Sequence, residues 1–196
     1  MRRPFVIAAA AALFATVAGV TGYTLWNDAR LAQGTPHIGG AFSLVDVEGG
    51  QVTDRSLLGR PTAIFFGFTW CPEVCPTTLA AMTVALAELG ADGDRLNVVF
   101  VSVDPERDTP AQMKLYLSNF DRRILGLTGS PRAVDEAARA YRIFHRKVAL
   151  EGGGYTVDHS SSVYLFDRRG RFVAPVAYGT SQEKLLAELK ALVHGR

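Results

Sequence analysis

The sequence has little cysteine. Its 196 residues include only Cys71 and Cys75, four positions apart. A small exported domain that depends on disulfides needs more pairs than this, and pairs that close larger loops, so a disulfide scaffold is excluded. A closed structural zinc site is disfavoured too, because it usually takes two ligand pairs and there is no second cysteine pair. The one pair present predicts redox or metal chemistry.

The chain also lacks any long run of like charge. Its 21 Lys and Arg residues nearly balance 19 Asp and Glu residues, which leaves a formal charge of +2. No segment could follow a phosphate backbone, so we expect no nucleic acid partner. The length and the 48% hydrophobic content fit one packed domain with a short appendage.

Charge is absent altogether from Pro4 to Trp26, where apolar residues dominate. As a helix this run would be roughly 34 Å long, enough for a hydrocarbon core of about 30 Å, whereas the core of a signal peptide has about 7 to 15 residues. Two arginines precede the run, and Tyr23 and Trp26 close it as an interfacial belt would. We therefore predict that residues 1–26 form an N-terminal transmembrane helix, with a cleaved signal peptide as the alternative. Either way the domain lies outside the cytosol, in a bacterial periplasm or a mitochondrial intermembrane space.

A stretch rich in glycine and proline, residues 27–40, is expected to be a linker to a folded domain over residues 41–196. Apolar runs, helical spacing and capping residues predict the elements of that domain. Strands are expected at 62–68 and 96–103, hairpins at 42–52 and 162–176, and helices at 77–89, 109–120, 130–141 and 180–195. This alternation predicts an α/β fold with a central mixed sheet and helices on both faces. The cysteine pair at a strand-to-helix junction makes a thioredoxin-like arrangement the best match.

The first of these strands runs directly into the two cysteines. Pro76 has no amide hydrogen and fits only the first turn of a helix, so Cys75 should lie at or just before the helix N-terminus. There the helix dipole favours a thiolate. Pro72 stiffens the turn that begins at Cys71. Such a pair could form a disulfide or bind one soft cation, and the spacing does not choose between them.

An imidazole could complete a metal site, and the chain has four histidines. His37 lies in the expected linker and His194 in the last turn of the final helix, so neither is expected to be a ligand. His159, just before an expected strand, ranks narrowly above His145. Thiolates select Cu(I), and imidazole also accepts Cu(II), so copper in either oxidation state suits such a ligand set. Asp158 could orient His159 or merely form a turn.

Several motifs occur in order along the chain, at residues 65–76, 103–110, 126–129 and 157–160. They closely resemble those of the Sco/SenC family over roughly residues 41–194. The resemblance implies a membrane-anchored, thioredoxin-like, copper-binding protein whose ligands are Cys71, Cys75 and His159. It further implies a metallochaperone that helps assemble the dinuclear copper centre of cytochrome c oxidase subunit II. That subunit would then be a partner, together with an upstream copper donor.

Some residues near these motifs depart from the family pattern or have two interpretations. Glu73 stands where the family more often has Asp, and Trp70 stands at a variable position. Glu73 would oppose ionisation of the thiols but favour a bound cation. Asp104, Arg107 and Asp108 could belong to an active site, yet they also match a strand that exits into a capped helix, and we favour that structural role.

The main alternative function is that of a thiol-disulfide oxidoreductase that reduces the cysteines of the oxidase subunit before copper arrives. Such enzymes usually have two residues between their cysteines, and this chain has three, so a carrier that is not an enzyme is preferred. A peroxidase is disfavoured because no separate resolving cysteine exists, and an inert disulfide ranks last. Dithiol exchange needs only Cys71 and Cys75, whereas copper binding also needs His159.

Overall fold

The computed structural model describes residues 16, 19–24, 26 and 38–195. The chain divides into two compact units, residues 1–37 and 38–196. The described residues of the first unit are helical. Most of the predicted anchor and linker lies outside the described residues, so these two assignments remain predictions.

The second unit is built on a seven-stranded mixed sheet with the order β2-β1-β5-β4-β3-β8-β9. Strands β3, β4 and β5 are parallel, whereas β1 runs antiparallel to β5 and β8 antiparallel to β3. The strands are β1 (Ser43–Asp46), β2 (Gln51–Thr53), β3 (Thr62–Gly67), β4 (Asn97–Ser102), β5 (Ile124–Thr128), β8 (Val163–Phe166) and β9 (Phe172–Val176). The predicted mixed sheet is confirmed.

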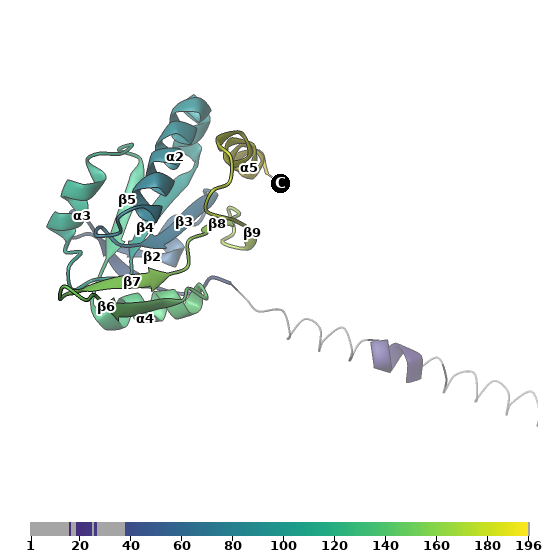
Figure 1. Ribbon diagram of the computed structural model, residues 1–196. Coiled ribbons are helices and arrows are strands. Elements are labelled where there is room, and N and C mark those ends of the chain that lie inside the picture. The colour runs from purple at the N-terminus through teal and green to yellow at the C-terminus, as the bar shows by residue number, and fades with distance from the viewer. Residues whose placement is uncertain (1–15, 17–18, 25, 27–37, 196) are drawn as a thin grey trace, which may run out of the picture. The chain divides into compact units, whose positions relative to one another are not determined.

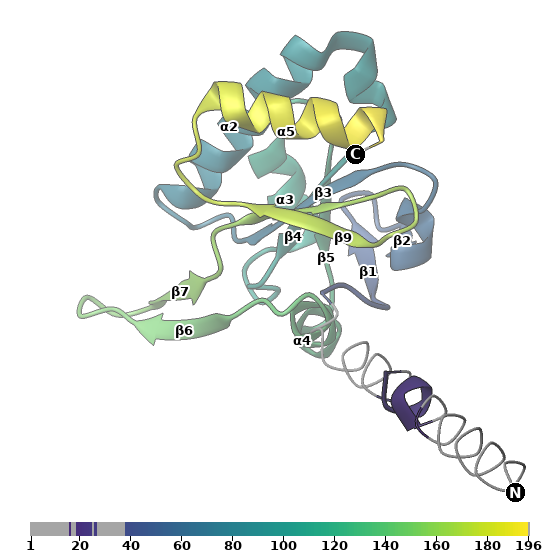
Figure 2. The same cartoon turned by 90° about the vertical axis from the view of Figure 1, so that its right-hand side faces the viewer.

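Helices cover both faces of this sheet (Figures 1 and 2). They are α2 (Val74–Leu89), α3 (Pro110–Leu117), α4 (Pro131–Ala140) and α5 (Gln182–His194), with 3₁₀ turns η1 (Asp54–Leu57) and η2 (Gly90–Arg95). On one face, Phe100 of β4 packs on Tyr116 of α3, with ring centroids 6.0 Å apart. On the other, Phe66 of β3 contacts Tyr141 at the end of α4, at 5.5 Å. Because successive residues of a strand point to opposite faces, the same strands contact helices on both sides of the sheet.

Helices α3 and α4 begin where capping residues predict them to begin, and the cap of α5 is Ser181, one residue after the predicted start. The side chains of Thr109, Ser130 and Ser181 accept hydrogen bonds from backbone N–H groups in the first turns of α3, α4 and α5. Helix α2 differs from the prediction, because it starts at Val74 rather than at residue 77. Pro76 fits in its first turn, where a backbone N–H would have no partner in the helix. The earlier start places Cys75 inside the helix.

Strand β5 and the hairpin of β6 (His145–Ala149) and β7 (Tyr155–His159) were not predicted. The hairpin forms a separate two-stranded sheet whose register sets His145 opposite His159. Most of β6 is polar and exposed, so it lacks the apolar alternation by which strands are recognised in a sequence. Strand β6 forms because it pairs with β7, and not because of an apolar pattern of its own.

Within the described residues, one helix is long and apolar enough to cross a membrane, the continuous stretch Val74–Arg95 formed by α2 and η2. Its apolar side chains, including Leu79, Met82 and Leu86, are buried in the domain core. Burial of that face explains its composition without a membrane. The predicted anchor at residues 1–26 is a separate segment of the chain.

Candidate metal centre

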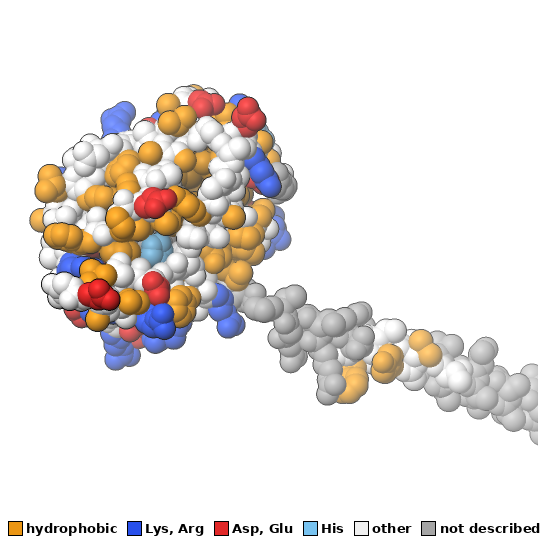
Figure 3. Space-filling view, in the orientation of Figure 1, with side chains coloured by type: hydrophobic (Ala, Val, Ile, Leu, Met, Phe, Trp, Pro, Cys, Tyr) orange, Lys and Arg blue, Asp and Glu red, His pale blue; other side chains and the backbone are white. Residues whose placement is uncertain are grey.

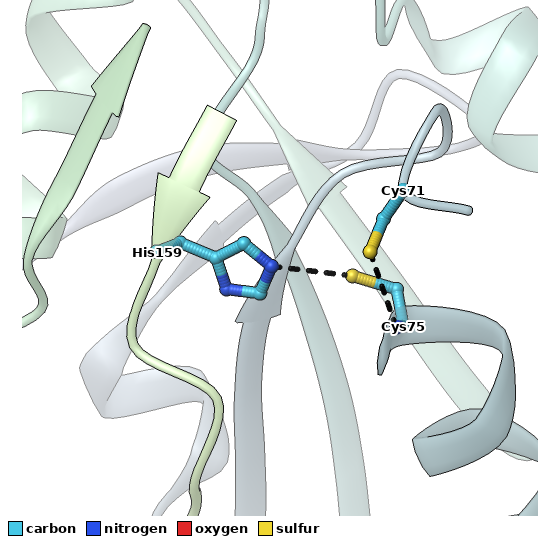
Figure 4. Close-up of side chains that lie close together, drawn as sticks. All are labelled: Cys71, Cys75 and His159. Carbon is cyan, nitrogen blue, oxygen red and sulfur yellow. Dashed lines mark hydrogen bonds between the residues drawn. The ribbon is translucent and has the colours of Figure 1, made fainter. Parts of the chain in front are cut away.

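The two cysteines meet where the end of β3 leads into α2 (Figure 4). Both are free thiols. Cys75 is completely buried in the first turn of α2, and Cys71 in the preceding loop is 9% exposed. The backbone N–H of Cys75 donates to Cys71 Sγ at 3.4 Å. Both cysteines are therefore buried, and Cys71 is the less completely buried of the two.

A glycine allows the sheet to approach the buried sulfur. A Cβ atom added at Gly67, the last residue of β3, would lie 2.6 Å from Cys75 Sγ and 2.8 Å from Phe100 Cε2. These distances are far below ordinary contact. The strand can come this close to the sulfur only because position 67 has no side chain.

His159 at the end of β7 completes the group. Its Nε2 atom lies 3.5 Å from Cys75 Sγ, and its Nδ1 atom lies 2.8 Å from the carbonyl oxygen of Ser160. Because a carbonyl can only accept, Nδ1 carries the proton and donates, which leaves the lone pair of Nε2 facing the sulfur. The neutral imidazole is the form that binds metals. The rings of Phe65 and Phe68 contact the imidazole by their edges, with centroids 6.1 and 5.7 Å away.

The ligand atoms of Cys71, Cys75 and His159 all lie within 4.8 Å of one another. In zinc proteins metal–sulfur bonds are about 2.3 Å and metal–nitrogen bonds about 2.0 Å, so ligand atoms bound to one ion can be up to about 4.6 Å apart. Small side-chain movements would therefore let all three reach the same ion. Among the described residues, this is the group of His, Cys, Asp and Glu side chains with that geometry.

The two thiols have opposite pKa shifts. A hydrogen bond with the Cys75 side chain lowers the pKa of Cys71 to about 3 against the opposing effect of burial. The same bond with Cys71, together with burial, raises the pKa of Cys75. The pair thus holds one proton and one negative charge at neutral pH. The thiolate is on Cys71, whereas the helix-dipole argument placed it on Cys75, because the hydrogen bond between the two side chains and the deeper burial of Cys75 both keep the proton on Cys75.

The other described histidines point elsewhere. His145 Nε2 lies 3.3 Å from a carboxylate oxygen of Asp135, and His194 Nε2 lies 3.1 Å from one of Asp92. His37 is outside the described residues. The structure therefore brings His159, the candidate ranked first, to the cysteines and leaves its competitor His145 paired with a different element.

Residues next to the three candidate ligands make contacts that differ from those considered in the sequence. Asp158 accepts a hydrogen bond from Arg146 at 2.9 Å and belongs to strand β7, not to a turn. The group that orients the imidazole is instead the carbonyl of Ser160, which no side-chain pattern could have indicated. Glu73 accepts a hydrogen bond from Tyr178 at 3.3 Å.

The family model described as SCO1/SenC matches residues 30–194. The chain belongs to the SCO1/SenC family. The Arabidopsis thaliana mitochondrial protein SCO1 homolog 1 is 41% identical over 141 residues, which cover 71% of this chain and 42% of that relative. Saccharomyces cerevisiae mitochondrial SCO1 is 35% identical over 202 residues, covering 94% and 68%. The resemblance inferred from the motifs is confirmed.

Solved Sco structures share the fold. Bradyrhizobium japonicum ScoI with copper bound has a TM-score of 0.75 and 49% identity, over 79% of this chain and 99% of that one. BsSco, described as having a disulfide switch and as a member of the Sco family of cytochrome c oxidase assembly proteins, has a TM-score of 0.66 and 26% identity, over 83% and 96%. The chain spans 42% and 62% of the length of two curated relatives, those from Arabidopsis and Schizosaccharomyces pombe. The predicted thioredoxin-like Sco fold is confirmed.

Proposed function

We propose that this SCO1/SenC protein binds copper through Cys71 Sγ, Cys75 Sγ and His159 Nε2, and carries it to the dinuclear copper centre of cytochrome c oxidase subunit II. The observation that carries the proposal is the convergence of these three ligand atoms within 4.8 Å. Two thiolates select the soft Cu(I) ion, and the imidazole extends the set to Cu(II). The copper bound to related ScoI structures supports the same cargo.

Charge favours copper in both oxidation states. Before binding, the pair shares one proton, which the metal must displace from Cys75 because the ligand is the thiolate. The two thiolates and a neutral imidazole then give a site of net charge −1 with Cu(I) and zero with Cu(II). Neither state buries a large uncompensated charge.

Exposed aromatic side chains surround the site and suit docking of a partner protein. Trp70 precedes Cys71 and is 61% exposed, and Phe144, bonded through its backbone to Ser160, is 57% exposed. Figure 3 shows hydrophobic side chains gathered on one face of the domain around a histidine. Copper transfer requires the ligands of donor and acceptor to meet, and such an apolar rim would exclude water while they do.

The proposed location is outside the cytosol, with the domain anchored by residues 1–26. The uncharged run of spanning length supports the anchor. Copper delivery to an oxidase subunit at a membrane surface, in a periplasm or intermembrane space, would benefit from such tethering because it raises the local concentration of the carrier.

Thiol-disulfide exchange is the second candidate function. It is favoured by the two free cysteines and by the thiolate on Cys71, the more exposed of the two sulfurs. The disulfide switch described for BsSco is consistent with it. This chemistry does not require the imidazole, so His159 distinguishes the two functions.

Replacement of His159 by Ala tests the proposal. Changes around metal ligands typically cost about 10 to 100-fold in affinity, so loss of a ligand should weaken copper binding at least that much, and Cu(II) more than Cu(I). Competition with chelators of known affinity measures this. Cys71 and Cys75 should still form and break a disulfide in the metal-free variant.

His145→Ala is the matched control, since His145 pairs with Asp135 and not with the cysteines. It should keep copper affinity. If His159→Ala also keeps native affinity for both oxidation states, the ligand set is wrong. If it loses dithiol exchange together with copper, the two functions are not separable at this residue.

A further inference from the structure

The strand that carries His159 is not part of the main sheet. Among the strands of the described residues, β7 pairs only with β6, and the two form their own sheet. Something other than sheet hydrogen bonding must therefore hold His159 in front of the cysteines, which belong to the β3–α2 junction. The contacts of Tyr155, the first residue of β7, show what does so.

The carboxylate of Asp104, in the loop after β4, is completely buried. One of its oxygens accepts a hydrogen bond from the hydroxyl of Tyr155 at 2.8 Å, and the other pairs with Nε of Arg107. Breaking these bonds would leave a buried carboxylate without partners, which costs free energy, so the folded protein keeps them. Asp104 thereby joins the β4–α3 loop to the start of β7.

Arg107 makes a second link to the same residue. Its Nη1 atom donates to the backbone carbonyl of Tyr155 at 2.9 Å, and its guanidinium lies 3.9 Å from the centroid of the Tyr155 ring. The rings of Phe68 and Trp70 are both 5.8 Å from the guanidinium. Phe68 in turn contacts His159. One planar cation thus contacts both the hairpin and the loop that leads to Cys71, an arrangement that suits arginine and not lysine.

We infer that Asp104 and Arg107 are positioning residues that hold β7 so that His159 Nε2 faces the two sulfurs. The inference deepens the proposed function and rests on it. Tyr155 and His159 are four residues apart on one strand, about 13 Å along it, and Val157 between them is buried. Release of the Tyr155 end would let the strand pivot about Val157 and move the imidazole away from the cysteines.

Other ion pairs of the hairpin are less suited to this role. Arg146 pairs with Asp158, but both belong to the hairpin and are mostly exposed. Lys147 reaches Glu106 in the β4–α3 loop, yet both side chains are about half exposed, so the pair is weak. Arg146→Gln is therefore the matched control, because it removes an arginine from the hairpin without touching the link through Tyr155.

A double-mutant cycle tests the inference. Arg107→Gln should weaken copper binding about 10-fold, the lower end of the range for residues around metal ligands, and Arg146→Gln should not. In a His159→Ala background, Arg107→Gln should cause no further loss, because its effect passes through the imidazole. An equal loss in both backgrounds, or native copper affinity in a folded Arg107→Gln protein, would overturn the inference.

A metal-free measurement separates this inference from the proposed function. Imidazole ¹⁵N spectra of the full-length protein report the bond from Nδ1 of His159, and Arg107→Gln should shift them towards those of a solvent-exposed histidine. Tyr155→Phe removes only the hydroxyl that donates to Asp104, and it should shift the spectra in the same direction. This variant replaces Arg107→Gln in the test if Arg107→Gln fails to fold. Unchanged spectra in a folded variant would contradict the inference, whatever His159→Ala does to copper.

Discussion

At the scale of single residues, the candidate site depends on a glycine and a buried carboxylate as much as on the three proposed ligands. Gly67 makes room for the sulfur of Cys75. The buried Asp108 carboxylate accepts hydrogen bonds from the backbone and hydroxyl of Thr69, at 2.9 and 2.7 Å, and from Ser102 at 2.6 Å. Thr69 stands two residues before Cys71, so this carboxylate fixes the loop from which the thiolate extends.

We predict that Gly67→Ala weakens copper binding and destabilises the domain. The new methyl group would overlap Cys75 Sγ and Phe100, and overpacking of this kind typically costs about 1 to 3 kcal/mol. Urea unfolding and copper competition measure the two effects. Gly152→Ala is the control, because a Cβ there meets nothing within 4 Å. Native affinity in Gly67→Ala would show that the sulfur can move without loss of the site.

We predict a specific pH dependence for Asp108. Burial raises the pKa of this carboxyl above its ordinary value of 3.8, in spite of its hydrogen bonds to Ser102 and Thr69. The folded protein then binds the proton more tightly than the unfolded chain, so the stability contributed by the carboxyl is fully present below about pH 4 and is lost as pH rises through the higher folded pKa. Asp108→Asn cannot titrate. The unfolding free energy of the native protein minus that of Asp108→Asn should therefore fall from pH 3 upward, and a rise would contradict the assignment.

At the scale of elements, the loop between β4 and α3 connects the two halves of the site. Asp108 fixes the loop before Cys71, while Asp104 and Arg107 contact β7. The sequence favoured a structural role for these three residues, as the exit of a strand into a capped helix. They do occupy such a position, since Thr109 caps α3, but their side chains face the ligand-bearing segments.

Helix α4 packs on the face of the sheet opposite to α3. A change there tests whether the stability of that face affects copper binding. We predict that Ser130→Ala lowers the unfolding free energy by about 1 kcal/mol, because the Ser130 hydroxyl caps α4 through the backbone N–H of Ala133. Copper affinity should not change. Ser130→Asp retains a capping oxygen and should keep most of the stability. A parallel loss of copper in Ser130→Ala would mean that the two faces are coupled.

At the scale of the whole molecule, the question is how residues 1–26 behave in the cell. We predict that they remain attached as a membrane anchor, because the uncharged run has spanning length and ends in an interfacial tryptophan. Mass spectrometry of the membrane fraction checks this, with an intact N-terminus as the expected result. A mature protein that begins after Ala18 and is found in the soluble fraction would identify the segment as a cleaved signal peptide.

The sequence by itself determined the mixed α/β architecture, the capped starts of α3 and α4, the start of α5 to within one residue, and the position of the cysteine pair at the junction of β3 and α2. These features depend on local patterns: apolar runs, capping hydroxyls and prolines in first turns. It also ranked His159 first, although from the residues alone the margin over His145 was narrow.

Only the tertiary structure decided that His159 meets the cysteines, since Cys75 and His159 are 84 positions apart and the hairpin that carries His159 was not predicted from the sequence. Their contact depends on strand order and on the packing of β7, which are properties of the folded chain. The same holds for the thiolate on Cys71. The hydrogen bond between the two side chains and the burial of Cys75 set which sulfur keeps the proton, and both exist only once the domain has folded.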